Sequence, residues 1–378
     1  MSVPDVFRTL SHRHWWAPGA ALVVLLLLAG GRAVPAAQQA NAWPACDLRT
    51  TERIVAVGDV HGSYDGLVGI LRTAGIIDAR ARWSGGRAIL VQTGDVVDRG
   101  PDSRKALDLL RRLEGEAMRA GGRVYTLVGN HEFMRMIGDW RYVSAEELAA
   151  FRTADSADLR ERAYAIVLAE AKRLAQEQQQ PAPDEAAFHD RFVKDIPLGY
   201  IEMKQAFAAT GVYGKWLRER YAVIRINGIV FLHGGVSPTT AALGCAGIND
   251  AVRRDLDVPN PTPEQTLAML SSSETGPLWY RGLAEEPEPA FAPALTNILE
   301  LLGASVIVVG HTVPADFRIT RRFDGRVIQI DTGMLGGSFY PGGMPSALEI
   351  RGDTVTAIYQ SGRERLTASA PAPVPTTR

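Results

Sequence analysis

Three short polar motifs, each following an apolar run, constrain what this chain can fold into. The runs and the motifs that follow them are, in chain order, Ile54–Val57 and Gly58–Gly62, Ala88–Val91 and Gly94–Gly100, and Val124–Val128 and Gly129–Glu132. Short apolar runs with glycine shortly after them predict buried strands. Because open α/β sheets bind ligands at the carboxyl ends of their strands, we expect the motif side chains to meet at one edge.

Two later histidines extend this pattern, since His233 and His311 also follow apolar runs. The resulting set contains two Asp, one Asn and three His, namely Asp59, His61, Asp95, Asn130, His233 and His311. Two cations held about 3.5–4 Å apart can activate a shared water and bind a phosphoryl oxygen. Carboxylate and imidazole ligands together suit Mn, Fe or Zn better than Mg or Ca. The sequence therefore predicts a dinuclear hydrolytic site, with Asp95 as the bridging carboxylate.

An alternative applies to each motif taken alone, because Gly-Asp and Gly-Asn are ordinary turn dipeptides. Five such motifs in order, each after a predicted strand, favour the metal site over a series of unrelated turns.

The motifs resemble the signature of the PPP-type metallophosphatases within the calcineurin-like phosphoesterase superfamily, and in particular the bacterial Shewanella-like protein phosphatases. The resemblance runs from about Arg53 to about Gly343. It implies a four-layer α/β/β/α sandwich, which we assign to residues 47–366. It also implies two metal positions, the first held by Asp59, His61 and Asp95 and the second by Asp95, Asn130, His233 and His311.

Residues beside the ligands have predicted roles of their own. His131 is placed to protonate the leaving group, and Asp98 to accept the other ring proton and fix the tautomer. Arg99 offers a planar fork for phosphate oxygens. The alternative for Asp98 and Arg99 is a solvated ion pair in a loop. Glu132 is predicted to support the site rather than to bind metal.

Two further residues have open interpretations. Arg281, in the Trp-containing loop Gly276–Gly282, is either a second phosphate-binding arginine, as the resemblance implies, or a surface arginine. Tyr340, in the loop Gly336–Gly343, either overhangs the site or is an ordinary core or surface tyrosine.

The amino terminus predicts export. Arg8 and Arg13 precede an apolar run at Ala17–Ala29, and Ala40–Ala42 supplies an Ala-x-Ala cleavage site. These are features of a secretory signal peptide, which we assign to residues 1–42. The run is shorter than the about 20 apolar residues that span a bilayer, so we expect a periplasmic or secreted protein without stable membrane insertion after cleavage. The alternative is anchoring by an uncleaved amino-terminal segment.

The chain has two cysteines, Cys46 and Cys245, and both would remain after cleavage. Their spacing does not match a Cys-x-x-Cys metal site. In an oxidising compartment they are expected to form a disulfide, the alternative being two separate buried thiols.

Residues 144–220 are expected to be a helical insertion. Ser144 and Glu147 have the spacing of a capping box, and the following sequence has helical periodicity. A Gln- and Pro-rich stretch at 176–183 divides it into at least two helices. The insertion could be a cap that selects substrate or a layer that only covers the sheet. Residues 367–378, rich in Ala and Pro, are predicted to be a disordered tail.

The predicted function is that of a secreted, manganese-dependent phosphomonoester hydrolase that acts on Ser/Thr or Tyr phosphoproteins. The predicted mechanism is direct attack on phosphorus by a metal-bridging hydroxide. A net charge of −1 shows no nucleic-acid footprint. One alternative is a dinucleoside-tetraphosphate hydrolase or small-molecule phosphoesterase, which Pro101 favours, whereas Asp98 and the run His233–Pro238 favour a protein phosphatase. The other alternative is a non-catalytic module that binds metal or phosphopeptides. Such a module would not need His131 as an acid.

Overall fold

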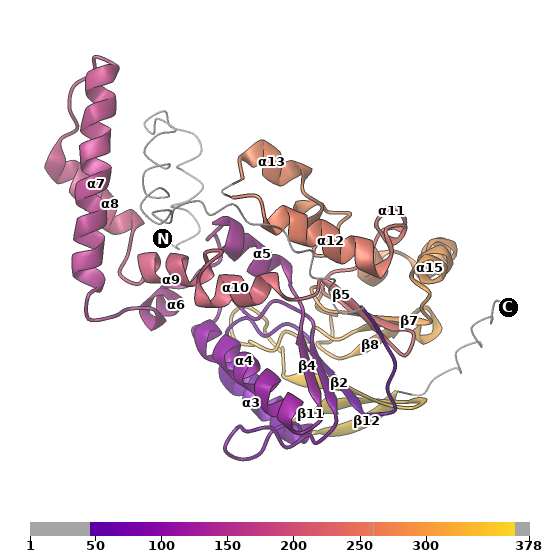
Figure 1. The fold of residues 1–378 in the computed structure, drawn as a ribbon. Helices are drawn as coiled ribbons and strands as arrows, with labels where there is room; N and C mark the ends of the chain where they lie inside the picture. Colours follow the sequence, from indigo (N-terminus) through magenta and orange to yellow (C-terminus); the bar gives the residue numbers. More distant parts are fainter. Residues whose placement is uncertain (1–45, 260, 367–378) are drawn as a thin grey trace.

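The computed structural model describes residues 46–259 and 261–366 (Figure 1). The predicted signal peptide at 1–42 and the predicted tail at 367–378 lie outside the described residues. Within the described part of the chain, no helix combines the length and apolar character needed to cross a bilayer.

The first sheet has six strands in the order β12-β11-β10-β2-β3-β4. Its strands are β2 (Ile54–Val57), β3 (Ile89–Gln92), β4 (Arg123–Thr126), β10 (Ser346–Arg351), β11 (Thr354–Tyr359) and β12 (Gly362–Leu366). Strands β2, β3 and β4 are parallel, with Ile54 opposite Ile89 and Ile89 opposite Arg123. Their carboxyl ends, and the three motifs that follow, therefore reach the same edge.

The second sheet also has six strands, in the order β1-β5-β6-β7-β9-β8. Its strands are β1 (Asp47–Leu48), β5 (Val223–Ile226), β6 (Ile229–Leu232), β7 (Val306–Val309), β8 (Thr320–Arg322) and β9 (Val327–Gln329). Strands β6, β7 and β9 are parallel. Asn227–Gly228 links β5 to β6 and Gly352–Asp353 links β10 to β11, both in the antiparallel hairpins that the turn residues predict.

Alternation of side chains along the strands builds the layers. In β2, Ile54 and Ala56 face the core between the two sheets, where they join Phe231 of β6. Val55 and Val57 face the opposite way, toward α3 (Tyr64–Thr73) and α4 (Ser103–Arg119). The far face of the second sheet packs against α12 (Gly244–Leu256) and α15 (Glu288–Leu302). The predicted α/β/β/α sandwich is confirmed.

The sequence patterns did not predict β1, β8 or β12. The first has only two residues, and β8 and β12 are polar strands at the sheet edges, with the Arg363–Arg365 part of β12 exposed. Charged edge strands are common because they resist pairing with other chains, but they lack the apolar alternation by which a strand is recognised.

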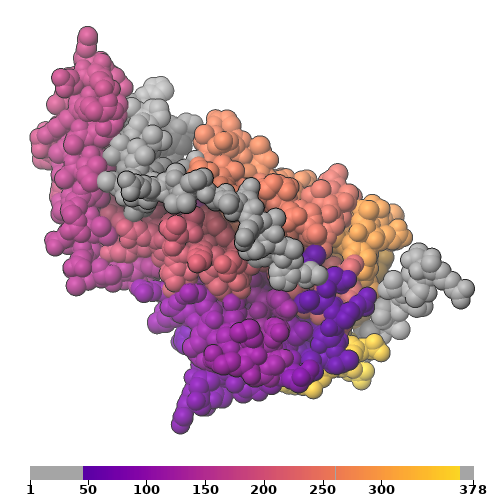
Figure 2. Space-filling model, in the orientation of Figure 1, coloured from indigo at the N-terminus to yellow at the C-terminus, as the bar shows by residue number. Residues whose placement is uncertain are grey.

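Residues 144–220 form α6 (Ala145–Ala150), α7 (Ser156–Glu177), α8 (Glu185–Asp195), α9 (Tyr200–Phe207) and α10 (Val212–Arg218). We call α6, α9 and α10 the base and α7 with α8 the arm. Phe207 and Tyr213 of the base belong to the core that contains α4. The arm packs around a small cluster that contains Val167 and Phe192 and is joined by Ile201 of α9, and it projects from the body as a column (Figures 1 and 2).

The other helices lie in the connections between these elements. They are α5 (Asn130–Ile137), α11 (Pro238–Ala241), α13 (Pro263–Ala268) and α14 (Gly282–Glu285), with short 3-10 turns at Leu270–Ser272 and Phe323–Gly325.

The predicted disulfide between Cys46 and Cys245 is present in the structure, with the two Cα atoms 6.2 Å apart. It ties the start of the described chain to α12. The Cys46 carbonyl also accepts a hydrogen bond from the Arg225 amide at 2.7 Å, so this segment continues into the pairing of β1 with β5.

Candidate metal centre

The residues predicted to bind metal all lie at strand ends. Asp59 and His61 follow β2, Asp95 follows β3, Asn130 follows β4, His233 follows β6 and His311 follows β7. Every one is buried, with at most 9% of its surface exposed. The two sheets meet here, because His233 Nδ1 donates to Thr93 O at 3.1 Å and the His311 amide donates to Asp59 Oδ1 at 3.0 Å.

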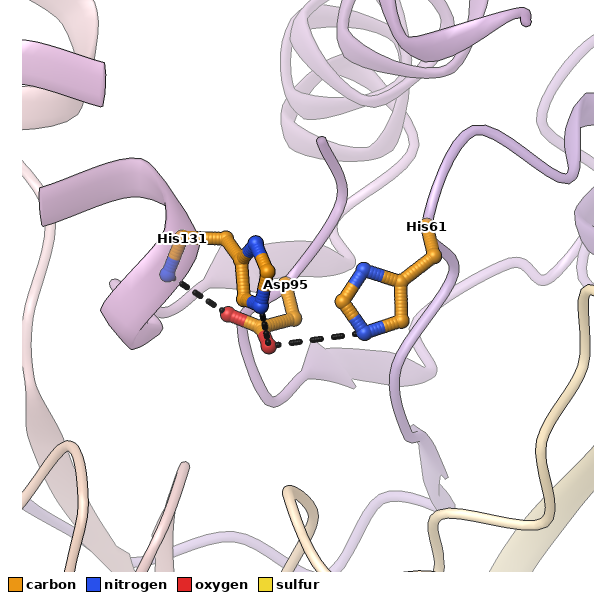
Figure 3. A group of neighbouring side chains, drawn as sticks. All are labelled: His61, Asp95 and His131. Atoms are coloured by element: carbon orange, nitrogen blue, oxygen red, sulfur yellow. Dashed lines mark hydrogen bonds and ion pairs between the residues drawn. The ribbon is translucent and has the colours of Figure 1, made fainter. Parts of the chain in front are cut away.

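One carboxylate oxygen lies at the centre of the group. Asp95 Oδ2 is 3.3 Å from His233 Nε2, 3.6 Å from His61 Nε2 and 3.7 Å from His131 Nε2. Figure 3 shows the Asp95 carboxylate between the rings of His61 and His131. This is the position that a carboxylate shared by two metal ions requires.

The protonation of the rings shows that these residues fit a cation. His61 Nδ1 lies 3.0 Å from Val97 O and His233 Nδ1 faces Thr93 O, and a carbonyl only accepts, so each Nδ1 carries the ring proton. Both Nε2 atoms therefore present lone pairs toward Asp95. Such backbone-oriented histidines are typical of metal ligands.

A second group of side chains overlaps the first, which consists of His61, Asp95 and His131. Asp95, His233 and His311 bring ligand atoms close together, with His233 Nε2 at 3.1 Å from His311 Nδ1. Asn130 Oδ1 lies 2.7 Å from His233 Nε2. Because His233 carries its ring proton on Nδ1, its Nε2 and the Asn130 oxygen face each other as two acceptors, and a cation between them would relieve their repulsion. Asp95 belongs to both groups, as a bridging ligand would.

Asp59 lies at the margin of these groups. Its Oδ2 is 3.8 Å from His61 Nε2, while its Oδ1 accepts from the His311 amide. Burial, with the nearby carboxyls of Asp331 and Asp95, raises the pKa of Asp59 well above its ordinary value. Asp331 is itself buried, and its Oδ2 has no hydrogen-bond partner within the described chain.

Asp331 is a residue that the sequence interpretation missed. A signal was available, because it follows the apolar run at the end of β9 as Asp59 follows β2. Its neighbours are Thr332 and Gly333, so the same strand-then-turn pattern recurs at this position.

Burial and neighbouring charges together give His61, His311 and Asp95 the protonation that a metal site needs. Burial lowers the pKa of His61 to about 3, and it also lowers the pKa of His311 strongly, so both rings are neutral at physiological pH. Burial would raise the pKa of Asp95, but the imidazoles of His233 and His131 outweigh it and the pKa is lowered. Neutral histidine and ionised aspartate are the forms that coordinate metal.

His131 and Asp98 form a hydrogen-bonded pair beside the centre. His131 Nδ1 lies 2.7 Å from Asp98 Oδ2, and the His131 amide donates to Asp95 Oδ1 at 3.0 Å. Burial lowers the pKa of His131, but the carboxylates of Asp95 and Asp98 outweigh that effect and raise it above its ordinary value. The ring is therefore suited to carry a proton toward the centre on Nε2.

Arg99 lies directly over the histidines. Its Nη1 donates to His61 Nε2 at 2.7 Å and contacts the Tyr340 hydroxyl, and its Nη2 is 3.4 Å from His131 Nε2. The rings of Tyr142 and Tyr340 lie 5.8 and 5.6 Å from its guanidinium carbon. Of the two interpretations of Tyr340, the structure bears out the one in which its loop overhangs the site.

Arg281 also lies at the site. Its Nη1 donates to His311 O and to Thr312 Oγ1, both at 2.9 Å, and the side chain is half-buried. The structure thus brings both predicted arginines to the edge that carries the histidines.

Glu132 supports the backbone of the site, as predicted. Its carboxylate accepts hydrogen bonds from the amides of Asp95, Val96 and Gly129 at 2.7–2.9 Å. It therefore holds the second and third motifs together, and it leaves no free oxygen for a metal.

The backbone of the site is strained. The side-chain-bearing residues His61, Asp95, Asp98, Arg99 and His311 all have φ between 46° and 72°. Such conformations are unfavourable outside glycine and persist only where surrounding contacts enforce them. Gly94 has φ of 98°, and a Cβ there would lie 2.5 Å from the Gly129 amide nitrogen, so the turn leading to Asp95 requires glycine.

Comparison with known families agrees with this geometry. Residues 52–315 match the calcineurin-like phosphoesterase family. The chain belongs to the calcineurin-like phosphoesterase family. It is a metallophosphatase by this membership and by the donor set described above.

Several members of the family are similar to this chain over most of its length. Shewanella-like protein phosphatase 2 of Arabidopsis thaliana is 31% identical over 314 residues, covering 82% of this chain and 78% of the relative. Shewanella-like protein phosphatase 1 of Plasmodium berghei is 25% identical over 315 residues, covering 82% and 75%. The crystal structure of the cold-active protein-tyrosine phosphatase of a psychrophilic Shewanella species superposes with a TM-score of 0.63 at 27% identity, covering 86% and 83%.

Proposed function

We propose that this protein is an exported, metal-dependent phosphatase that removes the phosphoryl group from phosphotyrosine in proteins. The observation that carries the proposal is the position of Asp95 Oδ2 among three imidazole nitrogens, with Arg99 and the His131–Asp98 pair beside it. This arrangement joins a site for cations, a binder of phosphate oxygens and a proton donor.

The proposed ligands divide into two overlapping groups. The first ion would be held by Asp59, His61 and Asp95, and the second by Asp95, Asn130, His233 and His311. The ions, with manganese as the proposed pair, would supply Lewis acidity toward the phosphoryl oxygens and toward the attacking water.

The remaining residues act on the substrate. Arg99 and Arg281 bind the phosphate oxygens, whose charge is spread over several atoms in the transition state. His131 donates the proton on Nε2 to the leaving oxygen, and Asp98 keeps the ring in the required tautomer through Nδ1. No side chain of the centre needs to form a bond to phosphorus.

Aromatic rings beside Arg99 support an aryl phosphate as the substrate. Tyr142 and Tyr340 flank its guanidinium, and Tyr142 and the neighbouring Phe339 are 42% and 55% exposed. Exposed aromatic faces favour stacking with the ring of a phosphotyrosine. The Shewanella relative of known structure is named a protein-tyrosine phosphatase, and the plant and Plasmodium relatives are named protein phosphatases.

Export is part of the proposal. The basic and apolar amino terminus predicts cleavage after residue 42, and the disulfide between Cys46 and Cys245 is of a kind that persists in oxidising compartments. Intact mass of the protein recovered from the cell envelope or medium tests this. A chain that retains residues 1–42 in the cytoplasm would contradict it.

The substrate is tested with the mature protein loaded with manganese. Peptides carrying phosphotyrosine, phosphoserine or phosphothreonine are compared with diadenosine tetraphosphate by phosphate release and product chromatography. We expect the highest kcat/KM for phosphotyrosine. Preferential cleavage of the dinucleotide would replace the proposal with a nucleotide hydrolase, and phosphopeptide binding without turnover would replace it with a binding module.

A further inference from the structure

We infer that Arg135 is a positioning residue for the general acid, and that through Arg135 and Glu147 the helical insertion holds Asp98 and Arg99 in their working conformation. The inference rests on the proposed function, in which His131 is the acid. It assigns a catalytic purpose to the base of the insertion, which contains no residue of the metal groups.

Arg135 is buried directly beneath Asp98. It is only 2% exposed, and its Nη2 contacts Asp98 Oδ1 and lies 3.3 Å from Glu147 Oε1. Asp98 has its other oxygen, Oδ2, on His131 Nδ1 at 2.7 Å. Because the two oxygens of a carboxylate are rigidly linked, fixing Oδ1 on Arg135 also fixes Oδ2, and with it the plane of the His131 ring.

Arg135 is in turn held by the base. Its guanidinium carbon lies 5.1 Å from the Trp140 ring and 5.2 Å from the Phe207 ring, and Nη1 contacts the sulfur of Met203. Phe207 and Met203 belong to α9. A planar, delocalised cation stacks between aromatic rings while donating in its own plane, which the compact ammonium of lysine cannot do.

The start of the insertion, together with Tyr142 just before it, also holds the strained turn that carries Asp98 and Arg99. These residues have φ of 72° and 68°. The Asp98 amide donates to Glu147 Oε1 at 3.1 Å, and the Arg99 amide donates to Tyr142 O at 3.0 Å. These two hydrogen bonds help to stabilise a backbone conformation that is otherwise unfavourable.

The two oxygens of the Glu147 carboxylate therefore have different roles. Its Oε2 accepts from the Ser144 amide at 3.1 Å and closes the capping box of α6, while Oε1 accepts from Asp98 and Arg135. The helix start thus places a buried carboxylate at a defined point below the acid. Removing its charge should loosen Arg135 and the turn without removing any group that touches substrate.

The test compares turnover of two aryl phosphates by the manganese-loaded enzyme. Phenyl phosphate has a poor leaving group that needs protonation, and p-nitrophenyl phosphate has a good one that does not. In Arg135→Lys, which keeps the charge but loses the planar fork, we expect kcat for phenyl phosphate to fall about tenfold or more relative to p-nitrophenyl phosphate, a part of the about 10²–10⁴ that a positioned acid supplies. Glu147→Gln should shift the same ratio in the same direction by less.

The matched control is the pair of Arg220 and Glu114. It also links the end of the insertion to the body, with 2.7 Å between Nη1 and Oε1 and the arginine over the Trp216 ring at 5.3 Å, but it does not contact Asp98. Arg220→Lys should lower thermal stability and leave the ratio of the two substrates unchanged. Metal content by mass spectrometry should match wild type in all variants.

The outcomes separate this inference from the proposed function. If His131→Ala is selective for the leaving group but folded Arg135→Lys and Glu147→Gln are not, positioning by Arg135 is wrong while the acid stands. Should Arg135→Lys not fold, Glu147→Gln alone decides. If His131→Ala slows both esters equally, the acid is wrong and the inference falls with it.

Discussion

The metal edge and the arm of the insertion are built in opposite ways. At the edge, buried polar groups are packed around Asp95 on backbone that is held in unfavourable conformations by contacts from both sheets. The arm is a helical hairpin with one small apolar cluster around Val167 and Phe192 and a surface of exposed ion pairs such as Lys172 with Glu185. The edge depends on the whole fold, whereas the arm depends mostly on itself, and such peripheral units open independently.

The largest expected effect is that of removing the metals. Dialysis against a chelator should abolish turnover of p-nitrophenyl phosphate but leave the helical circular-dichroism signal, to which the arm contributes, unchanged. Among added metals, manganese should restore turnover best. Removing a residue that is hydrogen-bonded to a metal ligand lowers metal affinity or activity by up to about 100-fold. Asp95→Asn should lower turnover by more than this, because Asp95 lies in both groups of candidate ligands. Activity and metal content measure this, and full turnover by metal-free protein would contradict it.

Next in size is the change at the acid. His131→Ala should slow phenyl phosphate by about 10²–10⁴ and p-nitrophenyl phosphate much less, with normal metal content. Asp98→Asn should show the same pattern in weaker form, and the double mutant should be little worse than His131→Ala. If His131→Ala loses metal, the His131 ring is a metal ligand and not the acid. The measurement can distinguish the two roles, because His131 Nε2 lies 3.7 Å from Asp95 Oδ2, close enough for either.

A matched pair of phenylalanines separates the base from the arm. Phe207 and Phe192 are both buried, at 2% and 5% exposed. Phe207→Ala should lower the free energy of global unfolding by about 3–5 kcal/mol, because its ring belongs to the main core. Phe192→Ala should speed hydrogen exchange in α7 and α8 alone and leave turnover unchanged. Equal effects of the two on global unfolding would show that the arm is not a separate unit.

The smallest effect on turnover is expected from the disulfide. Cys46→Ser with Cys245→Ser should lower the free energy of unfolding by about 2–4 kcal/mol, since the bond closes a loop of 199 residues. Turnover at low temperature should stay at the wild-type level, because the contacts described for the two cysteines lie at β5 and α12 rather than at the metal edge. A large fall in kcat with full folding would show that β1 and α12 influence the centre.

Local patterns were sufficient for much of this molecule. The strands that carry the motifs and the start of α6 at Ser144 follow from apolar runs, turn glycines and helix-capping spacing. The α/β/β/α layers follow instead from the resemblance of the motifs to the metallophosphatase signature. Each of these depends on residues that are close together in the chain, or on motifs whose residue types are all suited to bind metal. An aspartate that follows a buried strand points to the site wherever it recurs, but Asp331 stands in an Asp-Thr-Gly sequence that matches none of the family motifs.

Beyond the predicted pairing of His131 with Asp98, tertiary structure alone decided the surroundings of the proposed acid and of Arg99. Arg135 lies within α5 with nothing in its sequence to show that Asp98 and Glu147 converge on it from two other segments. Tyr340 is 241 positions from Arg99, and only the closure of the second sheet against the first brings its hydroxyl to that side chain. Sequence determines which residues can do the chemistry, because residue type and local spacing are written in it. Which distant side chains hold them in place depends on packing between layers, and that is settled only when the whole chain has folded.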